Sequence, residues 1–240
     1  MMSAIRRCLR GLSLGAGDVV LLPEHTHHQV SRQAYLEEIT ALAVELGANV
    51  VGGSHHQRAA EGAVNTGAMV SSDGVVVGEY DKLRPYAAER RVVEPGRRLG
   101  EMTLGGRRIL VTICADFWFS DLFARAGRLP DLVLVPAYSV TRKSTPDYSR
   151  SLWRHLAIAR AYELGVYVGI SDWGYAADAP KPTTSGVGGF ADPTTTDPAA
   201  FFTPITDGVL VVDLSFDALE AFRADRVARG FFWKKPNGTP

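Results

Sequence analysis

Three residues whose side chains can act together on a carbonyl carbon occupy similar positions in the chain: Glu24, Lys82 and Cys114. Each of them follows an apolar run, at residues 18–22, 75–80 and 109–113. Such runs predict buried strands. A cysteine at a strand end is usually a core residue. However, ligand sites of open α/β sheets lie beyond the carboxyl ends of the strands, so the three side chains can converge there.

The three side chains have complementary chemistry. A thiol attacks efficiently only as the thiolate, and its free pKa is about 8.5. A carboxylate such as Glu24 can accept the proton of Cys114, and the Lys82 ammonium can stabilise the thiolate. Lys82 and the backbone N–H of Ala115 can then stabilise the oxyanion of a tetrahedral intermediate. These groups predict acyl transfer through a thioester, and we expect Asp116 to hold the turn by hydrogen bonds.

The motifs around these residues resemble those of the nitrilase superfamily, the carbon–nitrogen hydrolases. The similar motifs are Pro23-Glu24, Asp73-Gly74 before Tyr80-Asp81-Lys82, Ile113-Cys114-Ala115-Asp116, Pro136, residues 159–163 and Asp192-Pro193. The resemblance implies that Glu24, Lys82 and Cys114 form a catalytic triad, with Glu89 supporting the lysine. It also implies an α/β fold of the α-β-β-α sandwich type and a homodimer or larger assembly.

The start of the chain departs from this family pattern. Members usually have a strand and a long helix before the strand that leads to the glutamate, whereas here only 17 residues precede Asp18. We therefore expect an N-terminally short member that lacks the usual first strand. Trp118 stands where many members have arginine, and Ser120 replaces a common proline. These two differences concern the substrate and stability rather than the triad.

Helical and strand patterns alternate along the chain, which predicts an α/β domain with a mixed sheet or two sheets. Helices are expected at 3–14, 31–46, 120–127, 149–164 and 215–224, and further strands at 49–51, 63–70, 131–135, 166–170, 187–191 and 208–213. Residues 83–106 and 173–188 are rich in proline and glycine and predict loops. In the helix at 149–164, the expected inner face is Leu152, Leu156, Ala159 and Tyr162. We expect one domain over residues 1–240.

The composition excludes several classes of protein. The 240 residues include 26 basic and 26 acidic side chains, so zero net charge gives no reason to expect a nucleic-acid or anionic-membrane partner. No apolar run reaches the ~18 residues of a membrane span. The two cysteines, Cys8 and Cys114, fit neither a disulfide framework nor a zinc pattern. We therefore expect a cytoplasmic enzyme, and read the arginine-rich start as a short helix, with targeting as a minor alternative.

Aromatic residues gather near the expected site. Tyr86, Phe117, Trp118 and Tyr138 are candidates for the walls of a substrate pocket, as is Trp173 in the loop after its strand. Ordinary core packing explains these aromatics equally well. A neutral protein with aromatic residues near its site suggests a small, neutral or weakly polar substrate.

Histidines after the first strand support a different hypothesis. His25, His27 and His28 follow the first strand closely, as the first ligands of some metal-dependent amidohydrolases do, and the pair His55-His56 can add ligands. Yet 240 residues are few for a metal-binding barrel, and apart from Asp172 no later His/Asp pair falls at a strand end. Solvated loop histidines near the pocket are the simpler interpretation.

The sequence therefore favours hydrolysis of a non-peptide C–N bond through a cysteine thioester, without metal or cofactor. An amide is the first choice of substrate because it is the commonest activity that the resemblance implies. Nitrile, carbamoyl-amine and acyl-transfer chemistry use the same triad in the family. One alternative is the metal-dependent amidohydrolase. Another is a catalytically silent interaction subunit with the same fold, which the short start suggests and the intact triad argues against.

Overall fold

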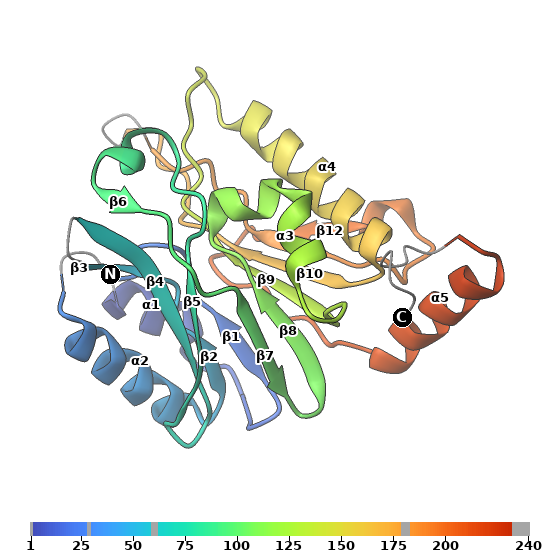
Figure 1. Cartoon of the computed structure of the whole chain (residues 1–240), viewed down its shortest axis with the longest axis horizontal. Helices are drawn as coiled ribbons and strands as arrows, with labels where there is room; N and C mark the ends of the chain where they lie inside the picture. Colours follow the sequence, from blue (N-terminus) through green and yellow to red (C-terminus); the bar gives the residue numbers. More distant parts are fainter. Residues whose placement is uncertain (1, 28–29, 59–61, 179–182, 232–240) are drawn as a thin grey trace.

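Within the residues that the computed structural model describes (2–27, 30–58, 62–178 and 183–231), two six-stranded sheets pack face to face between two layers of helices (Figure 1). Strand β1 contacts β9 and β10 across the interface between the sheets, and β5 contacts β7. The predicted α-β-β-α sandwich is therefore confirmed. No helix of the described residues is long and apolar enough to cross a membrane.

The first sheet supplies the strands that lead to the glutamate and the lysine. Its strands are β1 (Val19–Leu21), β2 (Asn49–Val51), β3 (His55–Arg58), β4 (Ala63–Val70), β5 (Val76–Asp81) and β6 (Val93–Glu94). The order is β1-β2-β4-β3, and β4 also pairs with β5 and β6. Residues 2–18 form helix α1 and no strand, so β1 lies at an edge of the sheet, as the short start predicts.

The second sheet supplies the strand that leads to the cysteine. Its strands are β7 (Gly100–Leu104), β8 (Arg107–Val111), β9 (Leu132–Pro136), β10 (Tyr167–Ser171), β11 (Gly189–Ala191) and β12 (Phe202–Pro204). The order is β12-β11-β10-β9-β8-β7, with β8, β9 and β10 parallel. The carboxyl ends of these three central strands therefore point to the same edge, where Cys114, Ala137 and Asp172 follow them.

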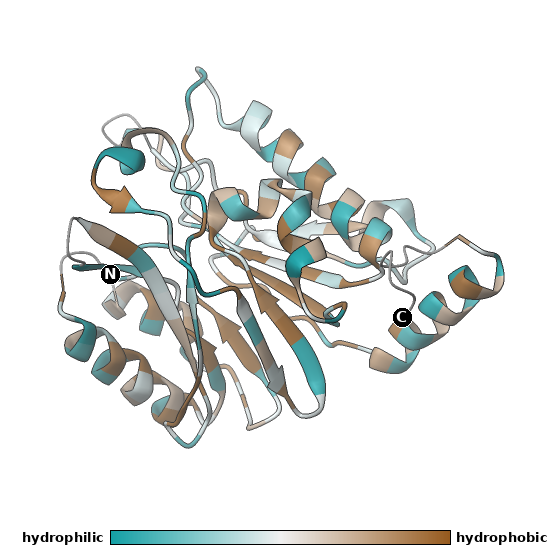
Figure 2. Cartoon of the chain, in the orientation of Figure 1, coloured by the Kyte–Doolittle hydropathy of each residue, from teal (hydrophilic) through white to brown (hydrophobic). Residues whose placement is uncertain are grey.

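Helices cover the two outer faces of the sandwich. They are α1 (Met2–Leu9), α2 (Arg32–Leu46), α3 (Ser120–Arg125), α4 (Asp147–Leu164) and α5 (Phe216–Ala228), with short 3-10 turns η1 (Ala87–Arg91), η2 (Cys114–Trp118) and η3 (Pro198–Ala200). The strands between the layers are mainly hydrophobic, whereas α2 and α4 carry hydrophilic residues on their outer sides (Figure 2). One apolar cluster joins the two sheets to α4, and a second joins α1 and α2 to the first sheet.

Local signals in the sequence explain helix α2. The Ser31 side chain accepts a hydrogen bond from the Ala34 N–H at its start, and Gly47 takes the left-handed conformation (φ 62°) at its end. Tyr35 and Ile39 are fully buried on its inner face. The Tyr35 hydroxyl accepts the backbone N–H of Ala68 in β4 at 2.9 Å, which fixes the helix to the sheet.

Three expected elements differ in the structure. Residues 83–106, expected as loop, contain η1, β6 and β7, and β7 pairs with β8 along its whole length. The expected strand at 208–213 does not form, because residues 202–204 take the edge position beside β11 as β12. Helix α1 ends at Leu9 rather than at residue 14. Gly11, two residues after Leu9, adopts a left-handed φ of 84°.

The inner face of α4 also differs from the expected one. Trp153, Ala157 and Ala161 are buried against the second sheet, whereas Leu152 and Tyr162 are 41% and 44% exposed. Small alanines on the inner face let the helix backbone approach the strands, and Trp153 fills the remaining space. Because apolar residues occur on more than one side of this helix, its periodicity did not identify the face that packs.

We expect Tyr35→Phe to lower the free energy of unfolding by about 1–3 kcal/mol, because the buried Ala68 N–H would lose its acceptor. Urea unfolding followed by circular dichroism measures this change. The matched control is Tyr148→Phe, since Tyr148 is 58% exposed and the change should be within about 0.5 kcal/mol. Equal unfolding midpoints for the two variants would contradict the role of the Tyr35 hydroxyl.

Candidate active site

Glu24 lies shortly after the end of β1 and is held by residues that follow strands of the second sheet. Its backbone N–H donates to the Ala137 carbonyl at 3.2 Å, and its carbonyl accepts the Trp173 indole N–H at 2.7 Å. Gly53 makes the close packing of this loop possible, since a Cβ there would lie 2.1 Å from the Pro23 carbonyl oxygen. Glu24 is therefore fixed where the two sheets meet. Trp173, expected as a pocket wall or core aromatic, acts here as a hydrogen-bond donor.

Lys82 follows β5, and its side chain ends between two carboxylates. The Nζ atom lies 2.7 Å from Oε1 of Glu24 and 2.5 Å from Oε2 of Glu89. The side chains of Lys82 and Glu24 are 3% and 1% exposed, so this ion pair is almost fully shielded from water. The structure thus places Glu89 beside the lysine, at the position that the resemblance implies.

Asn65 joins the same cluster and was not identified from the sequence. Its Nδ2 atom donates to Glu24 Oε1 and to Glu89 Oε1, both at 2.8 Å. Its backbone carbonyl accepts the backbone N–H of Lys82 at 2.7 Å. The sequence signal that could have revealed it is an amide side chain within the mainly apolar strand β4. Asn65 holds the two carboxylates on either side of the lysine.

Cys114 lies beyond the end of β8, on the first residue of turn η2. Its φ is 47°, a left-handed conformation that non-glycine residues seldom adopt. Such strain is kept only where the surrounding structure imposes it, and it is frequent at functional sites. The residue is buried, and its Sγ atom lies 3.7 Å from the Tyr138 carbonyl oxygen. The turn thus presents the thiol toward the edge where the strands end.

The charges of the cluster act on one another strongly. Burial raises the pKa of the Cys114 thiol, and the charge of Glu24 and a hydrogen bond with its side chain raise it further, while Lys82 lowers it. Burial lowers the pKa of Lys82, but Glu24, Cys114 and Glu89 together raise it above its ordinary value. Burial raises the pKa of Glu89, but hydrogen bonds and the Lys82 charge bring it below its usual range. Lys82 therefore remains an ammonium, and a thiol next to a carboxylate is suited to proton transfer.

The aromatic residues expected around the pocket occupy different environments. Phe117 is fully buried and stacks on Trp153 with a centroid distance of 6.1 Å, so it belongs to the core. Tyr138, Trp118 and Tyr86 are 36%, 39% and 53% exposed. The Tyr138 ring lies 5.5 Å from the His25 ring, close to the cluster, and the Tyr86 N–H donates to Glu89 Oε2 at 3.1 Å.

Among the described residues, His25 and His27 of the loop after β1 do not lie in one group of possible metal ligands. His27 pairs with Glu38, His55 stacks on Tyr35 and contacts the Thr66 carbonyl, and His28 lies outside the described residues. Among the residues that the structure describes, one group of three metal-binding side chains forms, from His25, His56 and Glu89.

Asp172, the acidic residue at the end of β10, binds protein groups rather than this histidine cluster. It accepts hydrogen bonds from Ser139, Trp173 and Val187. Burial raises its pKa to about 6, although these donors favour the charged form. Its position after β10 therefore serves to hold neighbouring loops together.

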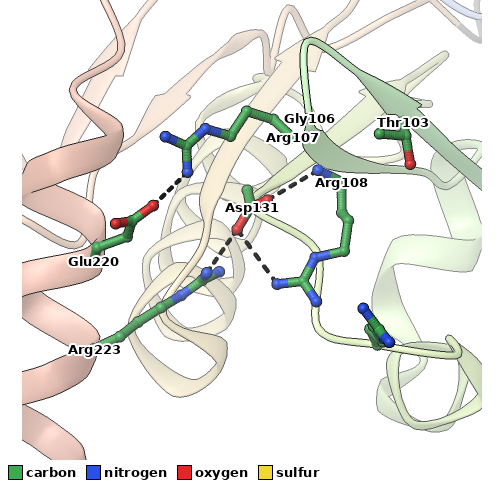
Figure 3. A pocket seen from close by; sticks show the side chains of 8 residues that line it. Thr103, Gly106, Arg107, Arg108, Asp131, Glu220 and Arg223 are labelled. Carbon is green, nitrogen blue, oxygen red and sulfur yellow. Dashed lines mark hydrogen bonds and ion pairs between the residues drawn. The ribbon is translucent and has the colours of Figure 1, made fainter.

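A cavity of about 570 Å³ lies at the other end of the second sheet (Figure 3). Its lining residues are Thr103, Gly106, Arg107, Arg108, Arg128, Asp131, Glu220 and Arg223. Arg223 of α5 bonds to buried Asp131 at 2.6 Å and to two backbone carbonyls, so it anchors the helix to the sheet. This cavity adjoins the start of β8, whereas Cys114 follows its end, so the cavity is separate from the cluster around Lys82.

The sequence comparison identifies the family. Residues 17–223 match the carbon–nitrogen hydrolase family. The chain belongs to this family. It is therefore a hydrolase that acts on carbon–nitrogen bonds other than peptide bonds. A comparison with curated protein sequences gives no match.

Solved structures of carbon–nitrogen hydrolases share the fold. Nit3 of Saccharomyces cerevisiae, from branch 10 of the nitrilase superfamily, has a TM-score of 0.74 at 19% identity, over 93% of this chain and 85% of Nit3. An amidase from Nesterenkonia sp. has a TM-score of 0.68 at 24% identity, over 96% and 88% of the two chains. A Xanthomonas campestris CN-hydrolase superfamily protein with an arsenic adduct in its active site gives 0.71 at 24% identity, over 99% and 91%.

Asp116 connects the cysteine turn of this carbon–nitrogen hydrolase to the lysine loop. Its Oδ2 and Oδ1 atoms accept the backbone N–H groups of Leu83 and Arg84 at 2.9 and 2.8 Å, directly after Lys82. Burial raises the pKa of Asp116 to about 7, against these hydrogen bonds. The contacts agree with the expectation that Asp116 holds the turn by hydrogen bonds.

We expect Asp116→Asn to lower the free energy of unfolding by about 1–3 kcal/mol, because one oxygen that accepts a backbone N–H becomes an NH₂ group. Chemical unfolding measures the loss. Asp121→Asn is the matched control, since Asp121 also pairs with Arg84 but is 56% exposed, where an ion pair contributes only about 0–1 kcal/mol. The role of Asp116 is refuted if both variants are equally stable.

Proposed function

We propose that this protein hydrolyses a small amide through a thioester on Cys114, with Glu24 and Lys82 as the other two catalytic groups. The observation that carries the proposal is the buried cluster in which Lys82 bridges Glu24 and Glu89 beside the Cys114 thiol. Titratable side chains that cluster away from water, with strongly shifted pKa values, are frequent at functional sites. Membership of the carbon–nitrogen hydrolase family gives the class of bond.

In the acylation step, Glu24 accepts the proton of the Cys114 thiol, and the thiolate attacks the amide carbon. The Lys82 ammonium and the Ala115 N–H stabilise the oxyanion. Ala115 lies in the first turn of η2, where N–H groups have no partner within the helix. Glu24 then gives its proton to the nitrogen, the C–N bond breaks, and ammonia or an amine leaves.

In the deacylation step, Glu24 takes a proton from water, and the resulting hydroxide attacks the thioester carbon. The C–S bond breaks, the carboxylic acid leaves and Cys114 recovers its proton from Glu24. Glu89 and Asn65 do not touch the substrate in this scheme. They keep Lys82 charged and in position, because each contacts the groups that surround its ammonium.

An amide is the substrate class that the structural neighbours favour. One mutant of the Nesterenkonia amidase has been solved in complex with butyramide, and another shows the Michael addition of acrylamide at the active-site cysteine. Nitriles and carbamoyl amines would react through the same cluster, and assays that supply each substrate class separately distinguish them. Assembly as a homodimer or larger and a cytoplasmic location remain predictions from the sequence.

We expect Cys114→Ala to abolish release of ammonia from amides, and Cys114→Ser nearly to abolish it, because the thioester cannot form. A screen of amides, nitriles and carbamoyl amines, with ammonia and the acid measured together, tests this. Cys8→Ala is the matched control, since Cys8 is the other cysteine and is exposed on α1. Full activity in Cys114→Ala would rule out the mechanism.

A further inference from the structure

Two histidines lie beside the catalytic cluster, and the thioester mechanism uses neither of them. The possible ligand atoms of His25, His56 and Glu89 all lie within 4.8 Å of one another. The two rings meet edge to face with a centroid distance of 4.8 Å, and His56 Nε2 lies 3.7 Å from Glu89 Oε1. Three segments distant in sequence meet here: the loop after β1, strand β3 and turn η1.

Glu89 can bind a metal ion without leaving Lys82. Its Oε2 atom faces Lys82 Nζ at 2.5 Å, and its Oε1 atom faces His56. The side chains of His25, His56 and Glu89 are 20%, 21% and 12% exposed, so the group is largely shielded from water but still reachable from solvent. One oxygen can therefore serve the lysine while the other serves a cation.

The charge around this group favours a cation. Two carboxylates, Glu24 and Glu89, surround one ammonium, Lys82, which leaves one excess negative charge in a buried environment. His25 Nε2 also lies 3.8 Å from Glu24 Oε1, so a positive ion at the histidines would interact with both carboxylates. Attraction between charges is strong in such a poorly solvated place.

We propose that His25, His56 and Glu89 form a binding site for a divalent transition-metal ion such as Zn²⁺, and that a bound ion slows hydrolysis. Two imidazoles and one carboxylate are a ligand set that zinc uses, with water in the fourth position. Ligand atoms of a tetrahedral zinc site are about 3.4 Å apart for bonds of about 2.1 Å, so small side-chain rotations close this group around an ion.

The inhibitory part rests on the proposed function. A divalent cation at His25 attracts the Glu24 carboxylate, whose Oε1 atom otherwise contacts Lys82 and Asn65. Glu24 is then drawn away from the thiol that it serves. The ion in this site is thus an inhibitor, and the thioester chemistry itself proceeds without it.

Binding is tested by calorimetric titration of the chelator-treated full chain with ZnCl₂, in a Cys8→Ala background that removes the exposed thiol. We expect one ion per chain, and an affinity at least about tenfold weaker in His56→Ala and in His25→Ala. Cys114→Ala and His155→Ala, whose histidine is exposed on α4, should keep the starting affinity. His56→Gln replaces His56→Ala if circular dichroism shows the latter unfolded.

An unchanged zinc affinity in the folded His56 and His25 variants would overturn the proposed site. Loss of zinc binding in Cys114→Ala alone would also overturn it, because the thiol would then be the ligand. Absence of zinc binding to the starting protein overturns it too. This titration needs no substrate. Zinc binding at these residues without amide hydrolysis would refute the proposed function and support the metal site. Amide hydrolysis without zinc binding would support the proposed function and refute the metal site.

Inhibition is tested on the same proteins by amide hydrolysis with increasing ZnCl₂, each variant being compared with its own metal-free rate. We expect half-inhibition near the dissociation constant, recovery on addition of EDTA, and a shift in His56→Ala by the same factor as the loss of affinity. An unshifted half-inhibition in His56→Ala would assign the effect to Cys114 and refute the inhibitory role.

Discussion

The buried ammonium of Lys82 between Glu24 and Glu89 is the interaction on which the site depends. Charges taken out of water are costly unless they are paired and hydrogen-bonded, and removing one partner of such a pair typically costs about 3–5 kcal/mol. Here the lysine has two carboxylates, and Asn65 donates to both of them. The glutamates come from the loop after β1 and from η1, so the ion pair also holds these segments together.

The second sheet contributes Cys114, the proposed nucleophile, and fixes its distance from this ion pair. Asp116 binds the two N–H groups that follow Lys82, and Ala137 accepts the N–H of Glu24. Each contact links a strand end of one sheet to a strand end of the other. The left-handed backbone of Cys114 is held by this frame, so its strain is offset by hydrogen bonds and packing around it.

Strand prediction succeeded at 49–51 and 63–70, which are each followed by turn residues. It failed at 208–213, an apolar run that lies outside the sheet because β12 occupies that edge. The inner face of α4 was also missed. Apolar residues on several sides of a helix do not specify which side packs until the opposite sheet is in place.

The sequence by itself determined the alternation of strands and helices, the caps of α2, and the three residues that follow strands, because these depend on local pattern and motif. Only the tertiary structure decided that these residues meet, that Asn65 lies between the carboxylates, and that His25 and His56 reach Glu89 while His27 turns to Glu38. These contacts join residues distant along the chain. Their distances depend on how the two sheets pack, which local patterns do not encode.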